Sequence, residues 1–303
     1  MRAKWRVLFL LLFTIGVTAE EIGPAQRLDY LEQVVMGKIV ENGIIERLSL
    51  LEQEVFGQTY QDLIPIRLSR LDRTLIYNGE YGQSLVFKIS AGEWFITKHC
   101  YQGCLLDRTA FLEKILYGFV TKGCLLERVQ KLIASCWSNG QLVSEKVLLP
   151  VNTLIKVKLL TELHTSKSRA GDKFQYEITE NIYLDSSRSI LVIPAGNIGA
   201  GNVVGVTKPG KFGRDGKLQL DPGQLTVFDG SRIQVYVDDQ AMRKNKSEKL
   251  AVGIAAAGIF IAGPAGIVTP LLVDGKDTVL SVGAEFYIQT KQAVQVEALR
   301  INM

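Results

Sequence analysis

The chain is poor in the side chains that most enzymes use. It has two histidines and four cysteines among 303 residues, which leaves little material for acid–base or nucleophilic catalysis. It also has little net charge beyond its first residues: without Arg2, Lys4 and Arg6, basic and acidic residues nearly balance. Nucleic-acid-binding proteins usually show a basic stripe or a strongly positive domain. We therefore expect no nucleic-acid partner and no enzymatic activity.

The few candidates for chemistry lack a supporting pattern. Neither His99 nor His164 lies in a Gly-x-Ser-x-Gly or comparable setting. No two cysteines have the Cys-x-x-Cys spacing of structural zinc sites. The stretch Gly199–Gly201 resembles a dinucleotide-binding loop only superficially, because strands surround it, and we interpret it as a bend in a barrel wall. The sequence thus predicts no catalytic residue, no metal site and no cofactor.

The first residues predict export. The basic start is followed by an apolar run and by Val17-Thr18-Ala19, which has small or β-branched residues at the positions that a signal peptidase reads. The apolar segment 7–19 is shorter than the ~20 residues needed to span a bilayer. We therefore expect residues 1–19 to be a cleaved signal peptide. Export also permits disulfide formation.

A repeat of twenty residues occupies segment 20–137. Arg27-Leu28 with Leu31-Glu32 recurs twenty and forty residues later and returns, after a degenerate stretch around 77–94, near Arg108 and Arg128. Apolar residues fall at helical spacing in each unit. Helices this short are marginal alone, so the units must stack, and the Arg and Glu of each unit are expected to pair on its exposed face. The array either buries its own leucines or docks another envelope component.

The cysteines lie in this repeat region. Cys104 and Cys124 occupy equivalent positions, with Cys100 and Cys136 beside them. Two disulfides that staple adjacent helices are therefore predicted, with the three pairings left open.

From residue 151 the pattern changes to alternation, as in Ile155–Leu159, Phe174–Ile178 and Ile233–Val237. Gly, Pro and Asp turn signals separate these segments. We expect a linker at 138–150 and, at 151–303, a mainly antiparallel β-barrel or sandwich. The predicted fold class is α+β, multidomain.

An uncharged apolar run, 250–273, interrupts the β pattern. As one helix it would reach ~36 Å, enough for a bilayer core, but its glycines and the turn signal Gly263–Gly266 are equally compatible with a helical hairpin. We interpret it as an apolar helical insertion that engages a membrane. The predicted inserting residues are Leu250, Ile254, Ile259, Phe260, Ile261, Ile267, Leu271 and Leu272.

A glycine-rich connection before this run is basic. Lys208, Lys211, Arg214 and Lys217 line it, which predicts either an anion-binding loop or a solvated hairpin loop.

The order of these segments resembles the C-terminal barrel of scaffold proteins of type IV secretion and conjugal-transfer core complexes. The matching motifs are Asn152–Ile155 in an opening strand, the turn Arg169–Gly171, the strand end Leu191–Asn197, the turn Phe228–Gly230 and the closing Ser281–Ala284. In that family the apolar insertion forms helices that reach into the outer membrane.

The resemblance implies a structural or scaffold protein in the periplasm or outer membrane of a diderm bacterium. Its partners would be envelope proteins or further copies of itself in a ring. The alternative hypothesis is a soluble periplasmic adaptor or binding module that uses the helical repeats.

Overall fold

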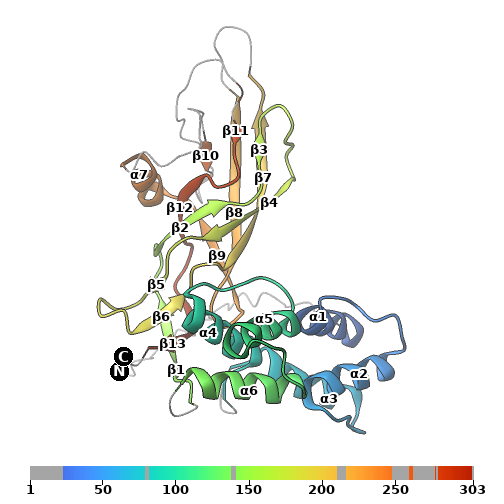
Figure 1. The fold of residues 1–303 in the computed structure, drawn as a ribbon. Coiled ribbons are helices and arrows are strands. Elements are labelled where there is room, and N and C mark those ends of the chain that lie inside the picture. Colours follow the sequence, from blue (N-terminus) through green and yellow to red (C-terminus); the bar gives the residue numbers. More distant parts are fainter. Residues whose placement is uncertain are drawn as a thin grey trace, which may run out of the picture.

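A computed structural model of the chain describes residues 23–78, 82–137, 141–209, 216–247, 259–261, 277 and 279–301. Helices come first and mainly antiparallel strands follow, so the fold is α+β as predicted (Figure 1). The helices form a layer at one end of the molecule, and the strands rise from it as a tall barrel.

The twenty-residue units are helices. Within residues 23–78 and 82–137 they are α1 (Pro24–Met36), α2 (Ile44–Phe56), α3 (Ile64–Leu75), α4 (Leu85–Thr97), α5 (Leu105–Tyr117) and α6 (Leu125–Cys136). In each helix, leucines and other apolar residues face a shared buried core. Gly37 and Gly57 end α1 and α2 in the left-handed conformation, φ 71° and 74°, which a glycine adopts without steric cost.

The stretch around 77–94, expected to be degenerate, contains a complete unit. Lys88 and Glu93 of α4 lie 21 positions after Arg67 and Asp72 of α3, so one extra residue had hidden the period. The six helices form two sets of three, because the capping residues Gly23, Gly43 and Leu63 are matched 61 positions later by Ser84, Cys104 and Cys124. Each set is a triangle of mutually contacting helices.

Acids and bases of the repeat pair between helices. Glu52 of α2 accepts hydrogen bonds from Nε and Nη2 of Arg67 in α3, at 3.0 and 2.8 Å, and from the Tyr60 backbone N–H at 3.0 Å. The same arrangement recurs at Glu32–Arg47, Glu93–Arg108 and Glu113–Arg128. All four carboxylates are fully buried. This corrects the expected exposed pairing within a unit: five positions turn a helix by about 140°, so its Arg and Glu face different neighbours.

Six of the described strands close into a barrel. Its pairing order is β8-β7-β4-β2-β12-β9, and β9 pairs again with β8. The strands are β2 (Leu154–Leu159), β4 (Lys173–Ile178), β7 (Ile198–Thr207), β8 (Lys217–Thr226), β9 (Arg232–Tyr236) and β12 (Glu285–Thr290). Alternate side chains point inward and form one buried cluster, so side chains fill the barrel.

A four-stranded sheet lies between barrel and helices (Figure 1). Its order is β1 (Ser144–Leu149), β13 (Val294–Arg300), β6 (Ile190–Ile193) and β5 (Ile182–Tyr183). Residues 144–149 of the expected linker are thus a strand that pairs with β13. Leu191 and Leu299 of this sheet belong to the helical core, while Val192 and Val296 belong to the barrel core. The sheet therefore joins the two cores.

The remaining elements lie at the other end of the barrel (Figure 1). Strand β3 (Leu163–His164) pairs with β11 (Val279–Leu280), and helix α7 (Asp239–Ser247) packs on β12. Within the predicted helical insertion, the structure describes only Ile259–Ile261, which form strand β10, parallel to β8. This corrects the helical prediction for these three residues, whose β-branched and aromatic side chains favour a strand. Leu250, Ile254, Ile267, Leu271 and Leu272 lie outside the described residues.

No helix in the described ranges has both the length and the apolar character needed to cross a membrane.

Candidate functional site

The loop between α4 and α5 is clamped onto the barrel. Nε2 of His99 lies 2.9 Å from Oε1 of Glu177 in β4, and Nζ of Lys158 in β2 lies 3.0 Å from the same oxygen. The backbone N–H of Cys100 donates to the carbonyl oxygen of Ala195 at 2.9 Å. Burial alone would raise the pKa of Glu177, but hydrogen bonds from His99 and Lys158 hold it below its ordinary value. The site therefore favours a charged carboxylate that joins the two modules.

Apolar contacts strengthen this junction. The rings of Phe87 in α4 and Phe228 lie 4.9 Å apart in an edge-to-face arrangement, and both are fully buried. The turn after Phe228 also contacts α4: a Cβ added at Gly230, whose φ is 83°, would lie 2.8 Å from Cγ1 of Val86. Such a contact requires glycine at this position. Aromatic pairs of this kind add to the area that they bury, so the junction is a true core.

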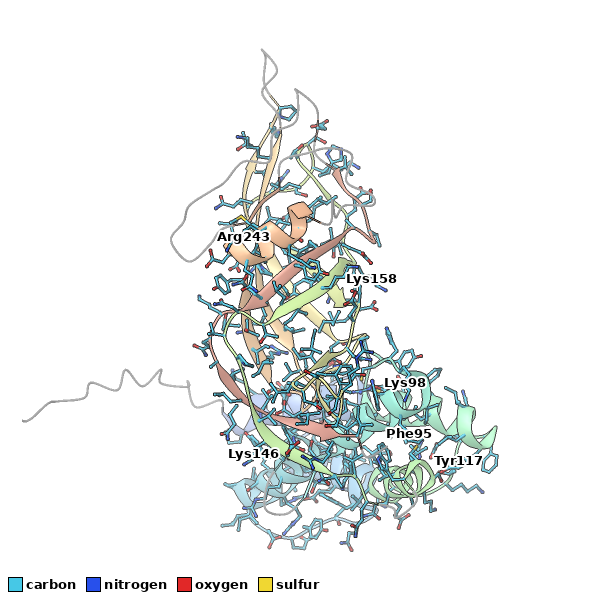
Figure 2. The ribbon with its side chains drawn as sticks, turned by 90° about the vertical axis from the view of Figure 1, so that its left-hand side faces the viewer. Phe95, Lys98, Tyr117, Lys146, Lys158 and Arg243 are labelled. Carbon is cyan, nitrogen blue, oxygen red and sulfur yellow. The ribbon has the colours of Figure 1, made fainter. Side chains whose placement is uncertain are left out.

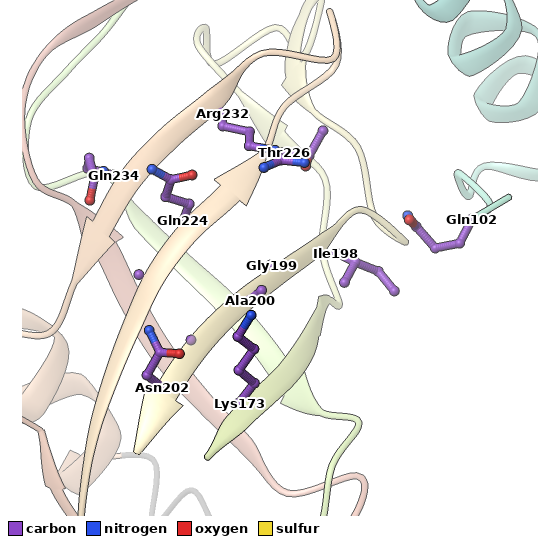
Figure 3. Close-up of a pocket in the computed structure, with 12 residues that line it drawn as sticks. Gln102, Lys173, Ile198, Gly199, Ala200, Asn202, Gln224, Thr226, Arg232 and Gln234 are labelled. Carbon is purple, nitrogen blue, oxygen red and sulfur yellow. The ribbon is translucent and has the colours of Figure 1, made fainter. Parts of the chain in front are cut away.

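Beside this junction, the barrel wall carries a polar pocket of about 500 Å³ (Figure 3). Gln102 reaches it from the α4–α5 loop, and the other lining residues come from β4, β7, β8 and β9. Its polar side chains are Gln102, Lys173, Asn202, Gln224, Thr226, Arg232 and Gln234. Ala200 on β7 pairs with Gln224 on β8, which pairs with Gln234 on β9. The small side chain of Ala200 thus leaves a hollow in a row of longer amide side chains.

At this pocket, Gly199 and Gly201 leave the barrel wall without side chains at two positions of β7. A Cβ at Gly199 would lie 2.1 Å from the Tyr176 ring, and one at Gly201 would lie 2.5 Å from the Phe174 ring. The two aromatic side chains are buried inside the barrel. The β7–β8 register shifts beside these glycines, between Ala200 and Asn202. The stretch Gly199–Gly201 is thus part of strand β7, with an irregularity in its pairing, and does not open a helix as a dinucleotide-binding loop does.

The pocket is lined by amide groups, two cations and the hydroxyl group of Thr226. Its lining holds two cations, Lys173 and Arg232, and no carboxylate, imidazole, thiol or serine hydroxyl. In the described parts of the chain, neither cation forms an ion pair. Amides and unpaired cations suit a ligand that carries anionic and hydrogen-bonding groups.

The two histidines have structural surroundings. His99 belongs to the junction with Glu177. Nδ1 of His164 lies 3.0 Å from the Ser166 backbone N–H, which donates to it, and 2.6 Å from the Ser166 hydroxyl. The contact is exposed and joins residues two positions apart, as in a local turn.

All four cysteines lie in the described ranges, and each is a free thiol. The predicted disulfides are therefore not formed in this structure. Cys104 and Cys124 lie against the C-terminal ends of α1 and α2: an added Cβ on Gly37 or Gly57 would lie 3.4 Å from their Cβ atoms. Cys100 is buried, and its Sγ lies 3.5 Å from the carbonyl oxygen of Ser90. Equivalent repeat positions thus bring Cys104 and Cys124 to two different helix ends.

The predicted anion-binding loop is described only at its ends. Lys208 follows β7 and Lys217 begins β8, so the two stand at the base of the β7–β8 connection. Lys211 and Arg214 lie outside the described residues. Among the residues that are described, no cluster of three or more His, Cys, Asp and Glu side chains is arranged to hold a metal ion.

No protein-family model and no curated protein matches the chain. Among solved structures, ComB10 of the Com type IV secretion system of Helicobacter pylori is similar, with a TM-score of 0.29 and 14% sequence identity. The match covers 49% of this chain and 90% of that chain. A likeness at this level establishes neither the fold nor a function.

Proposed function

We propose that the protein is a non-enzymatic structural protein of the bacterial cell envelope, in which a barrel holds a helical array in a fixed orientation. The observation that carries the proposal is the continuous core between the two modules. Leu191, Phe228 and Leu299 come from the strand region but belong to the helical core. Each buried side chain of this size contributes about 1.5–3 kcal/mol relative to its exposed state. Such an interface favours one rigid unit over two mobile domains.

The chemistry of the described surface supports a binding role. The junction uses His99, one of two imidazoles in the chain, as a partner of Glu177. The adjacent pocket presents amides and cations. A rigid support with polar recognition groups suits a protein that positions other components, here envelope proteins or further copies of itself.

The predicted leader and the apolar run 250–273 support a location at the outer membrane. The elements that flank the run, α7 and β11, lie at the end of the barrel away from the helices (Figure 1). Insertion of the run into a bilayer would leave the helical array facing the periplasm. The barrel would then act as a spacer between the membrane and the partners of the array.

Membrane fractionation tests this proposal. The full chain and a variant that lacks Leu250–Val273 are expressed in a diderm host, inner and outer membranes are separated by density, and each is washed with alkaline carbonate. We expect carbonate-resistant recovery in the outer membrane for the full chain and its loss in the deletion variant.

Val204→Ser is the control, because it removes an exposed apolar side chain of the barrel wall, 48% accessible, and leaves the run intact. It should fractionate as the full chain does. Release of the full chain into the soluble periplasmic fraction would overturn the membrane location and favour the soluble adaptor.

A further inference from the structure

The end of α5 exposes a group of apolar side chains. Ile115 and Leu116 in its last turn and Phe119 and Val120 in the following loop are 47%, 38%, 62% and 43% accessible. We call these four residues the α5 tip. Phe119 contacts Tyr117, the last residue of α5, at 6.3 Å between ring centroids. The hydroxyl group of Tyr117 reaches α6, where it lies 2.8 Å from Oγ of Ser135. Exposed apolar side chains gathered at one helix end need an explanation beyond folding.

The internal repeat shows that the fold does not require them. The matching helix α2 has the same length and the same left-handed glycine after its last residue. At the positions of Ile115, Phe119 and Val120 it carries Glu54, Gln58 and Thr59. At the position of Leu116 it carries Val55, which is fully buried. The same backbone is therefore stable with a polar end.

The α5 tip also differs from the end of α2 in its charge. Lys114 and Lys122 flank the α5 tip, where α2 has Gln53 and Gln61. The single acid within residues 111–122 is Glu113, which is buried and paired with Arg128. Figure 2 shows Phe95, Lys98 and Tyr117 along the same edge of the helical module in that view. The tip is thus apolar, with cations beside it and no exposed acid among its own residues.

We propose that the α5 tip docks on an anionic phospholipid surface. Its apolar side chains enter the interfacial region of the bilayer, and Lys114 and Lys122 remain at the level of the negatively charged headgroups. The tip is a helix end and a loop, a shape that suits shallow insertion. A stable protein–protein contact needs about 800 Å² on each partner, more than four side chains at one helix end provide. The proposal does not depend on the apolar run or on the outer-membrane location.

Vesicle flotation with the full chain tests the proposal. We expect binding to vesicles that contain phosphatidylglycerol, weaker binding to vesicles of phosphatidylcholine alone, and weakening by salt. Lys114→Gln with Lys122→Gln should lower the partition coefficient about 25-fold, because each lysine near the surface contributes about fivefold. Phe119→Gln with Val120→Thr, which installs the residue types of the α2 end, should lower it about tenfold.

Gln58→Ala with Thr59→Ala at the α2 end is the matched control and should bind as the parent protein does. All variants are compared after thermal unfolding has shown that they are folded. A variant that lacks Leu250–Val273 separates the two membrane contacts, because it should retain binding that depends on Phe119 and on salt.

Three results would overturn the proposal. One is vesicle binding that is unchanged in the folded Phe119→Gln, Val120→Thr variant. Another is binding that disappears completely with the apolar run, a result that leaves the proposed function standing. The third is loss of self-association in the tip variants with no change in lipid binding, which would assign the tip to a protein contact.

Discussion

Arg27 of α1 donates a hydrogen bond from Nε to Oδ1 of Asp72 in α3, 2.7 Å away and 45 positions along the chain. This pair completes a ring, because Glu32–Arg47 joins α1 to α2 and Glu52–Arg67 joins α2 to α3. Three short helices are thus tied to one another by a closed ring of ion pairs, in which Arg47 also contacts Asp29 of α1. In the second set of helices, Lys88 and Ile133 occupy the positions that correspond to Arg27 and Asp72. Because isoleucine has no charge to pair with Lys88, the ring of ion pairs in this set is not closed. Burial lowers the pKa of Lys88.

Removal of one ring carboxylate should be costly. Glu52→Ala leaves Arg67, whose side chain is 5% exposed, buried without its carboxylate. We expect a loss of about 3–5 kcal/mol in the free energy of unfolding, measured by urea denaturation. The control Asp62→Ala breaks a partly exposed pair with Arg70 and should cost much less, because water screens such a pair. Equal losses in the two variants would contradict the account of the ring.

The open ring can be closed by substitution. Ile133→Glu places an acid at the position that corresponds to Asp72, opposite Lys88. In a double-mutant cycle with Lys88→Met, we expect a favourable coupling of about 1–3 kcal/mol between the introduced carboxylate and the Lys88 ammonium group. Urea denaturation of the parent, the two single variants and the double variant measures it. A coupling of zero would mean that α4 and α6 do not repeat the α1–α3 contact.

Most of the architecture is readable from the sequence, and its limits have physical causes. The helices follow from leucine spacing, and the strands follow from alternation at Ile155–Leu159 and similar segments. The unit at α4 escapes detection because Lys88 replaces the usual arginine and one inserted residue shifts the period. The pairing of Glu52 with Arg67 cannot be predicted from the spacing within one helix, because the partner of each residue depends on how the helices stack.

The pocket on the barrel is harder to foresee. Gln102, Lys173 and Arg232 come from distant segments and meet only when the barrel closes beside the α4–α5 loop. The glycines at 199 and 201 are a usable signal, since they mark the point where aromatic side chains inside the barrel leave no room for a Cβ. The predicted disulfides are not formed in the structure, and equal positions in the repeat place Cys104 and Cys124 at equivalent, separate helix ends.

Acid should weaken the second set of helices through Glu113. Although burial raises its pKa, hydrogen bonds from Arg128 and Thr121 hold the pKa of Glu113 below its ordinary value. Its contribution to stability is therefore complete above the unfolded pKa of about 4.3 and is lost as pH falls through the lower folded value. Urea denaturation at several pH values should show a smaller decline below pH ~4.3 for Glu113→Gln than for the parent. An identical decline would argue against the charged pair.

Gly199 and Gly205 of the barrel should differ in how well they tolerate substitution by alanine. Gly199→Ala forces a methyl group against the buried Tyr176 ring, and we expect a loss of about 3 kcal/mol in unfolding free energy. In Gly205→Ala the nearest atom is Oε1 of Gln219, at 3.1 Å and at the end of a flexible side chain, so the loss should stay below about 1 kcal/mol. Thermal and urea unfolding compare the two variants. A tolerated Gly199→Ala would contradict the tight wall.

The cysteine thiols should react more slowly with an alkylating reagent the more deeply they are buried. Desolvation raises the pKa of Cys100 far above its ordinary value and raises that of Cys136 to about 11. Because the thiolate is the reactive form, we expect iodoacetamide to modify the less buried Cys124 first and Cys100 last. Mass spectrometry of the unreduced native protein follows the order. Unreactive cysteines that respond only after reduction would instead reveal disulfides.

The fixed orientation of the helical array on the barrel is the central claim, and residual dipolar couplings test it most directly. Backbone N–H couplings from α1–α6 and from the six barrel strands are measured in the same weakly aligned sample of the full chain. The account predicts that both sets fit a single alignment tensor, because the helices and the barrel share the core around Phe87 and Phe228. Two tensors of different magnitude or orientation would show that the modules move independently and would contradict the account.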